Sequence, residues 1–265
     1  MSLARATAKI NLALVVGALR ADGKHEVATV LQRIDLADGI SLAPGSSLEI
    51  AGFPEDTLVR AALLALAEAG GVEPHWTVAI EKRIPVGSGL GGGSSDAAAA
   101  LRLANELLPV PLGNERLHEI ATGIGADVPF FLAEGPQLGT GDGSVLEPLD
   151  LPDDYRVVLV LPAGAAKPST AAVYEAFGGA DGFAERQAAL RAGLASGDLA
   201  ALPANDLASS PLADELRERG AFRADVTGAG PVVYGLFAGR EPAEAARRAL
   251  SARGRTWLTT PAWYG

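Results

Sequence analysis

Cysteine is absent from this chain of 265 residues, and histidine occurs only three times. Without cysteine the chain can form neither disulfide bonds nor thiolate metal sites, which fits a reducing cytoplasm, where we expect the protein. The three histidines, His25, His75 and His118, are scattered along the sequence. A zinc site built on histidine is therefore not expected.

Long apolar runs are missing as well. None reaches the roughly 18 residues that suggest a membrane span. The apolar segment Leu12–Leu19 follows Arg5 and Lys9, as in a signal peptide, but Arg20 comes next and no cleavage site is present. We therefore expect neither a membrane anchor nor a signal peptide.

Basic residues are the minority among the charges, since 22 lysines and arginines face 32 aspartates and glutamates, for a net charge of −10. No long basic run interrupts this acidic balance. Nucleic acid and anionic membranes are therefore not expected as partners. We expect a small-molecule substrate, a monomer or a homodimer, and any bound phosphate to be held by local dipoles and a few cations.

The composition is that of an ordinary globular protein, with 48% hydrophobic and 20% charged residues. The length suffices for one large or two modest domains. The segment Pro148–Asp154, rich in proline and aspartate, predicts a boundary between domains over 1–150 and 151–265. Strand-like and helix-like patterns mix without strict alternation, which predicts an α+β fold.

Local patterns predict several elements of the first domain. Strands are expected over Arg5–Val16 and Trp76–Glu81, the second because apolar and polar residues alternate there. His25–Ile34 is compatible with a strand or a short helix, and Asp38-Gly39 predicts a turn after it. Leu58–Ala69 has the amphipathic pattern of a helix and is stopped by glycine.

Glycine is concentrated in residues 87–93, where it fills five of seven positions. The segment follows the strand Trp76–Glu81, and Ser94-Ser95-Asp96 then supply the residue types that cap a helix, which continues to Leu108. A strand, a glycine loop and a helix start form an anion site, because glycine lets the backbone approach a ligand that the first N–H groups face. We therefore expect a bound phosphate.

Two other phosphate loops do not fit this segment. Gly87, Gly89 and Gly92 have the G-x-G-x-x-G spacing of dinucleotide folds, but no acidic residue ends a second strand about 20 residues later. Gly87 and Gly92 also have P-loop spacing, but Gly93 and Ser94 follow where lysine and a hydroxyl residue are required. A flexible glycine–serine linker is the other alternative, against which periodic apolar elements flank the loop on both sides.

The segment from Ile84 to Asp96 closely resembles the phosphate-binding motif of the GHMP kinases, above all in its triple glycine followed by Ser-Ser-Asp-Ala-Ala. The resemblance implies ATP and Mg²⁺ as cofactors, with Ser95 as a possible Mg²⁺ ligand. It also implies a ribosomal protein S5 domain 2-like N-terminal domain and a ferredoxin-like C-terminal domain. The residues expected to bind ATP are Pro85, Val86, Gly87, Ser88, Gly89, Leu90, Gly91, Gly92, Gly93, Ser94 and Ser95.

Lys9 and Asn11 alternate with apolar neighbours, so both project from one face of the first strand. A solvated strand face would give the same pattern. Together with Asp22–Glu26, the segment resembles the N-terminal motif of the family, in which the lysine lies beside the catalytic aspartate. The resemblance implies that Asn11 and His25 contact the substrate.

Lys24 departs from this motif. The family usually has a tyrosine at this position, which stacks on a cytosine ring of the substrate. Tyr174 matches a second aromatic residue that the family places beside the base. We expect Tyr174 to carry most of the stacking, with the aliphatic stem of Lys24 on the other face of the ring.

Asp127 lies between a predicted helix that ends at Gly125 and a strongly apolar run. A bare helix cap is the ordinary outcome for such an aspartate. The segment from Gly125 to Phe131, however, matches the Gly-Ala-Asp-Val-Pro-Phe-Phe motif of the family letter for letter. The match implies that Asp127 is the catalytic base, with Lys9 as its partner.

A second glycine loop, Asp225–Pro231, runs into a predicted strand. Alone, it could be only a turn. It resembles the C-terminal glycine loop of the family, which supports the active site from the second domain. Asn205-Asp206 also fits a segment of the family, for which we expect a structural role.

The resemblance covers nearly the whole chain and is greatest to members of the family in the non-mevalonate isoprenoid pathway. It implies an enzyme that uses ATP to phosphorylate the 2-hydroxyl of 4-diphosphocytidyl-2-C-methyl-D-erythritol. Two alternatives remain open: a kinase of the same family for homoserine, mevalonate or a sugar, and a non-catalytic nucleotide-binding module of the same fold.

Overall fold

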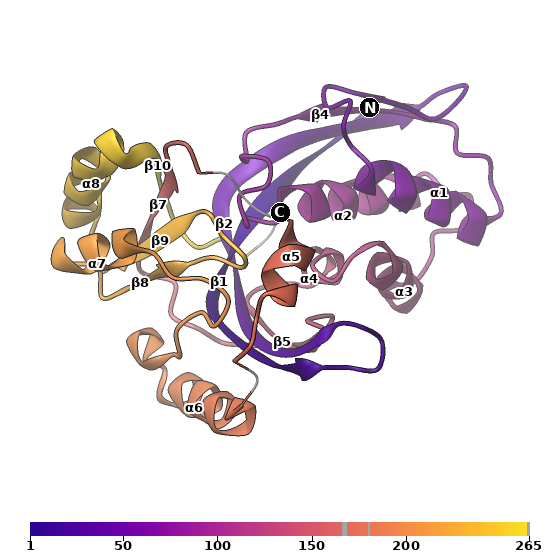
Figure 1. The fold of residues 1–265 in the computed structure, drawn as a ribbon. Helices are drawn as coiled ribbons and strands as arrows, with labels where there is room; N and C mark the ends of the chain where they lie inside the picture. The colour runs from indigo at the N-terminus through magenta and orange to yellow at the C-terminus, as the bar shows by residue number, and fades with distance from the viewer. Residues whose placement is uncertain (166–168, 180, 264–265) are drawn as a thin grey trace.

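The molecule contains two β-sheets, on which its helices pack (Figure 1). The strands of the first sheet precede residue 149 in the sequence, and those of the second follow residue 155. This computed structural model describes residues 1–165, 169–179 and 181–263. None of the helices in these ranges is long and apolar enough to cross a membrane. The mixture of strands and helices confirms the α+β expectation.

The first sheet is built on a long antiparallel hairpin of β1 and β2, which runs through the centre of the molecule (Figure 1). β4 and β5 pair with β2 in antiparallel fashion, β6 pairs with β5, and the short β3 lies parallel to β4 at one edge. The strands are β1 (Ser2–Leu19), β2 (His25–Pro44), β3 (Glu49–Ala51), β4 (Trp76–Glu81), β5 (Gln137–Gly141) and β6 (Val145–Pro148).

The turn predicted at Asp38-Gly39 is wrong, because β2 runs through both residues as far as Pro44. Asp38 is 1% exposed, which a turn at the surface would not allow. Its carboxylate accepts hydrogen bonds from the backbone N–H groups of Arg83 and Ile84 and from the Lys82 ammonium. Partners more than 40 residues away thus hold an apparent turn residue inside a strand.

Four helices complete the first domain: α1 (Leu58–Gly70), α2 (Gly92–Asn105), α3 (Asn114–Ile124) and α4 (Val128–Leu132). The alanines of α2 from Ala97 to Ala100 are fully buried, because the helix packs between the sheet and the neighbouring helices. The predicted cap at Ser94-Ser95-Asp96 is wrong. The helix already begins at Gly92, and Gly91 occupies the N-cap position in a left-handed conformation without a side-chain cap.

The second sheet has the order β10-β7-β9-β8, and its neighbouring strands are all antiparallel. α7 and α8 pack on it through an apolar cluster that includes Val158, Leu216 and Ala243. The strand order and the β-α-β-β-α-β succession agree with the expected ferredoxin-like domain. The elements are β7 (Arg156–Pro162), α5 (Thr170–Glu175), α6 (Phe183–Ser196), η1 (Leu199–Ala201), α7 (Pro211–Glu218), β8 (Arg223–Val226), β9 (Val233–Phe237), α8 (Arg240–Ala249), η2 (Leu250–Arg253) and β10 (Gly254–Thr259).

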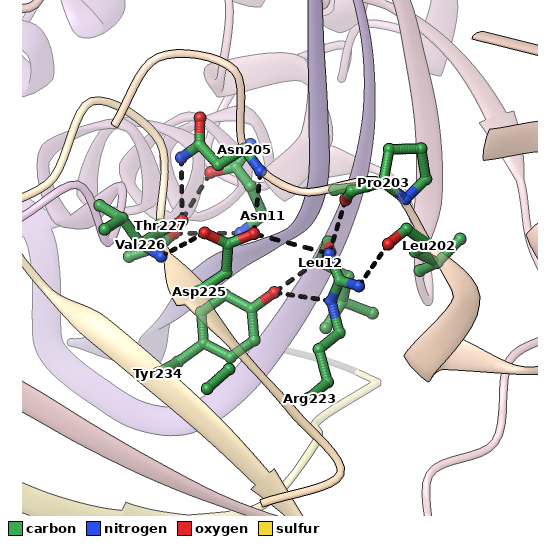
Figure 2. A network of polar contacts seen from close by, with 12 residues as sticks. Asn11, Leu12, Leu202, Pro203, Asn205, Arg223, Asp225, Val226, Thr227 and Tyr234 are labelled. Carbon is green, nitrogen blue, oxygen red and sulfur yellow. Dashed lines mark hydrogen bonds and ion pairs between the residues drawn. The ribbon is translucent and has the colours of Figure 1, made fainter. Parts of the chain in front are cut away.

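A buried polar network ties the second sheet to β1 (Figure 2). The Tyr234 hydroxyl on β9 donates to the carbonyl of Leu12 at 3.1 Å and accepts from Arg223 Nε at 3.1 Å. Leu12 lies at a register shift of the β1–β2 ladder, between Asn11 and Ala13. The second sheet therefore holds β1 one residue beyond Asn11.

We expect Tyr234→Phe to lower the free energy of unfolding by about 1–3 kcal/mol, because buried groups of Leu12 and Arg223 each lose a partner. Tyr155 is a matched control, since its buried hydroxyl has no hydrogen-bond partner in the described part of the chain. Tyr155→Phe should be neutral or slightly stabilising. Urea denaturation of both variants measures the difference, and equal losses would contradict the assigned role of Tyr234.

Candidate active site

A cavity of about 940 Å³ is lined by β1, β2, the loop before α2, α5 and the loop between β8 and β9. It gathers residues that lie more than 200 positions apart in the sequence, from Lys9 to Ala229. Most of the residues predicted for the site line it: Lys9, Asn11, Lys24, His25, Pro85, Val86, Gly87, Ser88, Gly89, Gly91, Gly92, Gly93, Ser94, Asp127 and Tyr174.

Two predicted residues, Leu90 and Ser95, do not line this cavity. Leu90 is fully buried in the apolar cluster beneath the loop, and its carbonyl accepts a hydrogen bond from the backbone N–H of Lys9. Ser95 is 2% exposed within the first turn of α2. The structure therefore does not support Ser95 as a Mg²⁺ ligand, whereas Ser94 does reach the cavity.

The glycine loop needs glycine for contacts as well as for conformation. Gly89 has a φ of +83°, and a Cβ on it would lie 2.5 Å from the carbonyl oxygen of Thr227. Gly91 has a φ of +72°, and a Cβ there would lie 3.0 Å from both Lys9 Cγ and Phe131 Cζ. The first distance shows that the two glycine loops meet across the domain boundary, and the second shows that the first loop packs onto the stem of Lys9.

Lys9 and Asp127 meet in the cavity as an ion pair, with 3.4 Å between Lys9 Nζ and Asp127 Oδ2. The lysine side chain is 5% exposed and that of the aspartate 41%. Asp127 stands at the N-cap position of α4 but makes no capping hydrogen bond, so the carboxylate is not a bare cap. A buried cation beside an accessible carboxylate is the arrangement expected of an acid–base pair.

Asn11 orients the Lys9 ammonium, which donates to Asn11 Oδ1 at 2.7 Å. The amide of Asn11 donates to Thr29 Oγ1 at 2.8 Å, and its backbone N–H donates to Thr227 Oγ1 at 3.0 Å. The alternative of a solvated strand face is wrong, because Asn11 is only 5% exposed. The sequence analysis did not identify Thr29 or Thr227; a single threonine on an apolar strand or in a loop carries little signal.

The second glycine loop is held by Asn205 (Figure 2). The side-chain amide of Asn205 donates to the carbonyls of Gly228 at 2.7 Å and Val226 at 2.9 Å. Asp206, the next residue, accepts from the backbone N–H of Val16 on β1 at 2.8 Å. Asn205-Asp206 thus has the structural role expected from the sequence: it joins the second loop to the strand that carries Lys9.

An aromatic cluster of His25, Tyr174 and Phe177 lines another part of the cavity. The ring of His25 lies 5.8 Å from that of Tyr174 and 5.9 Å from that of Phe177, between centroids. His25 Nδ1 lies 2.8 Å from the carbonyl oxygen of Gly17, to which it can donate a hydrogen bond. Phe177 is a further lining residue that the sequence analysis did not single out.

Lys24 is fixed at the rim of the cavity by an ion pair with Asp142, at 2.5 Å between Nζ and Oδ2. Asp142 also accepts from the hydroxyl and the backbone N–H of Ser144. Although partial burial raises the pKa of Asp142, the hydrogen bonds from Lys24 and Ser144 lower it overall to about 2. The pair joins the β1–β2 turn to the β5–β6 turn.

Lys82 lines the cavity near the start of α2, although no motif pointed to it. Its ammonium contacts Asp38 at 2.5 Å and Asp96 at 2.8 Å, and it lies 5.6 Å from the centre of the Phe53 ring. Burial raises the pKa of Asp96 to about 7, although Lys82 opposes the shift. One cation thus pairs with two buried carboxylates near the glycine loop.

Asp96 makes stability depend on pH. Its pKa is higher in the folded chain than the ordinary 3.8, so its contribution favours folding at low pH and is lost as the pH rises through about 7. Asp96→Asn should remove this dependence. The unfolding free energy of the variant minus that of the native chain should therefore rise by roughly 2 kcal/mol between about pH 5 and pH 8.

Denaturation of both proteins at each pH measures this difference. Glu119→Gln, at an exposed ion pair on α3, is the control. Its unfolding free energy should differ from that of the native chain by the same small amount at each pH. A difference between Asp96→Asn and the native chain that stays constant with pH would contradict the assignment.

Comparison with known proteins bears on this geometry. The family model for the GHMP kinases N terminal domain matches residues 56–135, and that for the GHMP kinases C terminal region matches residues 188–256. The chain is 38% identical over 258 residues to a 4-diphosphocytidyl-2-C-methyl-D-erythritol kinase of Nocardia farcinica, a match that covers 91% of this chain and 82% of the relative. It is also 38% identical over 264 residues to the enzyme of the same name from Geobacter metallireducens, with 93% of each chain covered.

Solved structures agree with the sequence matches. A crystal structure of 4-(cytidine 5'-diphospho)-2C-methyl-D-erythritol kinase superimposes with a TM-score of 0.82 and 33% identity, over the whole of both chains. A homoserine kinase from Cytophaga hutchinsonii superimposes with a TM-score of 0.73 at 18% identity, over 97% of this chain and 96% of the other. The second likeness shows only a shared fold.

Proposed function

Because this chain belongs to the GHMP kinase family, among the 4-diphosphocytidyl-2-C-methyl-D-erythritol kinases, we propose that it transfers the γ-phosphoryl group of ATP to the 2-hydroxyl of 4-diphosphocytidyl-2-C-methyl-D-erythritol. The observation that carries the proposal is the Lys9–Asp127 pair, 3.4 Å apart beside the glycine loop. It supplies a cation for the phosphoryl oxygens and a carboxylate for the hydroxyl.

We place the ATP phosphates on the loop Pro85–Ser94. The turns at Gly87, Gly89 and Gly91, each with positive φ, let the backbone approach the phosphates, and the first turn of α2 adds N–H groups and a favourable dipole. Beyond the loop, the end of the cavity lined by Phe53, Leu58 and Lys82 would receive the nucleoside.

The residues of this region fit a Mg²⁺ ion. Proteins commonly hold Mg²⁺ through one or two carboxylates together with substrate phosphates and water. Asp127 and Ser94 line the cavity beside the loop, while no cluster of three or more histidine or acidic side chains that could hold a metal occurs among the described residues. When bound, the ion would neutralise charge on the β- and γ-phosphates.

Asp127 would accept or orient the hydroxyl proton of the substrate while Lys9 stabilises charge on the transferred group. The transition state of phosphoryl transfer is loose in most analyses, so correct positioning contributes at least as much as proton abstraction. Asn11 supports both roles, because it holds the Lys9 ammonium in place.

The cytidine moiety fits the aromatic end of the cavity, on the far side of the reacting groups from the nucleoside of ATP. Tyr174 offers a ring for stacking, and the His25 ring lies 5.8 Å from it, between centroids. The stem of Lys24 borders the same end, with its ammonium drawn away by Asp142.

The remaining assignments follow the same proposal. We assign nucleotide binding to a domain over 1–150 and a supporting role to the domain over 151–265. The enzyme would act in the cytoplasm on a small-molecule substrate, as a monomer or a homodimer, without nucleic acid or membrane partners.

Asp127→Asn should lower kcat by about 100- to 10,000-fold, the usual effect of losing a positioned acid–base group. ATP affinity, measured by calorimetry, should persist, because the glycine loop is untouched. Asp214→Asn, at an exposed ion pair on α7, is the control and should leave kcat unchanged.

ADP release with a panel of substrates tests the function itself. The native chain should turn over 4-diphosphocytidyl-2-C-methyl-D-erythritol and not homoserine, mevalonate or a sugar. Turnover only of another alcohol would refute the proposed substrate. An Asp127→Asn variant with more than about a tenth of native kcat would refute the role of the carboxylate.

Tyr174→Ala should weaken binding of the cytidine substrate roughly 5- to 150-fold, since a base–aromatic stack contributes about 1–3 kcal/mol. ATP affinity should not change. Lys24→Tyr should bind the substrate equally well or more tightly. Phe222→Ala, at an exposed aromatic residue that does not line the cavity, serves as the control. Calorimetry measures all three, and a silent Tyr174→Ala would mean that the base lies elsewhere.

A further inference from the structure

Arg33 on β2 is the largest of the fully buried side chains, with 1% of its surface exposed. Burial, together with the nearby positive charge of Arg102, lowers the pKa of its guanidinium to about 10. A buried guanidinium is costly unless its donors are used. No motif of the sequence explains it, and it does not line the cavity.

The guanidinium of Arg33 holds the carboxyl-terminal end of α4. Nη2 donates to the carbonyl of Phe130 at 3.0 Å, and Nη1 donates to that of Ala133 at 2.7 Å. From the other side, Arg102 Nη1 donates to the carbonyl of Phe131 at 3.0 Å. A helix leaves its last carbonyls without intrahelical partners, and positive charge is favourable there. Two arginines thus fix the end of the helix whose other end carries Asp127.

A segment near the C-terminus completes this arrangement. Arg33 Nη1 also donates to the carbonyl of Trp263 at 3.1 Å, and the backbone N–H of Ala262 donates to the carbonyl of Arg33 at 3.0 Å. The backbone N–H of Gly135, just beyond α4, donates to the same Trp263 carbonyl at 3.3 Å. Arg33 therefore links three parts of the chain: β2, the end of α4 and residues 262–263.

An aromatic contact leads from Arg33 to the phosphate loop. Its guanidinium carbon lies 5.1 Å from the centre of the Phe130 ring and 5.7 Å from that of Phe131. The Phe131 ring also packs against Gly91, where a Cβ would meet both Phe131 Cζ and Lys9 Cγ at 3.0 Å. The stem of Lys9, the loop and the ring thus pack at one point.

We propose that Arg33 is a positioning residue of the kinase reaction: by holding α4 and the Phe131 ring beneath the cavity, it keeps Asp127 and Lys9 at their working separation. The inference rests on the proposed kinase activity. Lysine could not replace it fully, because a single ammonium lacks the planar fork that reaches the carbonyls of Phe130 and Ala133 while it faces both rings.

Arg33→Lys and Arg33→Met test this role by steady-state kinetics and calorimetry. We expect kcat to fall about 10- to 100-fold, because a misplacement of about 1 Å at reacting groups has an effect of this size. KM for the cytidine substrate and the affinity for ATP should change less than about threefold, since Arg33 touches neither subsite. Arg116→Met, at an exposed ion pair on α3, is the control and should behave as the native enzyme.

Phe131→Leu keeps the role testable if Arg33→Met does not fold. It leaves the hydrogen bonds of Arg33 intact but removes the ring that contacts Gly91 and Lys9, so kcat should fall without loss of ATP affinity. Combined with Arg33→Lys, the two losses should be less than additive, because both act through one contact path.

A crystal structure of Arg33→Lys gives a readout that is independent of turnover. The Asp127–Lys9 separation should open beyond its native 3.4 Å. An unchanged separation, or folded Arg33 variants with kcat within about twofold of native, would overturn the proposal. Equal losses in kcat and ATP affinity would also overturn it, since they indicate general disruption. Absence of turnover in the native chain would instead count against the proposed function.

Discussion

The buried ammonium of Lys9 is the constraint on which the active site depends. A cation with so little exposure needs oxygen partners in fixed positions, and it has Asn11 Oδ1 at 2.7 Å and Asp127 Oδ2 at 3.4 Å. Each partner is held from a different part of the chain: Asn11 by Thr29 on β2 and Thr227 in the second domain, and Asp127 by its place before α4. The charge of one residue thus binds the two domains and a short helix into one site.

Contact between the two glycine loops explains why the second domain is needed at all. The backbones approach so closely that a Cβ at Gly89 would lie 2.5 Å from the Thr227 carbonyl oxygen. Asn205 fixes the second loop from behind, while Tyr234 fastens the same sheet to β1 (Figure 2). The second domain lines the cavity with α5, through Tyr174 and its neighbours, and with the loop between β8 and β9. Through Thr227 it also contacts both the first glycine loop and the backbone of Asn11.

The sequence predicted what is encoded locally: the glycine loop, the strand that carries Lys9, and Asp127 before a strongly apolar run. The prediction failed where partners distant in the sequence determine the local structure. Asp38 looked like a turn residue because its backbone and cationic partners lie more than 40 positions away. Ser95 was expected as a possible ligand from the resemblance, but α2 begins at Gly92 and Ser95 is 2% exposed within its first turn. No short-range pattern predicts such pairings.

The lysines among the described lining residues of the cavity, Lys9, Lys24 and Lys82, are all engaged by carboxylates, so an incoming phosphate must compete for a cation. The three lysines differ in the distance from the ammonium nitrogen to the carboxylate oxygen. Lys24 and Lys82 lie 2.5 Å from Asp142 and Asp38, respectively, whereas Lys9 lies 3.4 Å from a carboxylate that is 41% exposed. Of the three, Lys9 therefore has the longest distance to its carboxylate, although Asn11 Oδ1 also accepts from it at 2.7 Å. In the proposed reaction, a phosphate that shares the Lys9 ammonium with Asp127 would leave the exposed face of the carboxylate free for the substrate hydroxyl, while the pair keeps its separation.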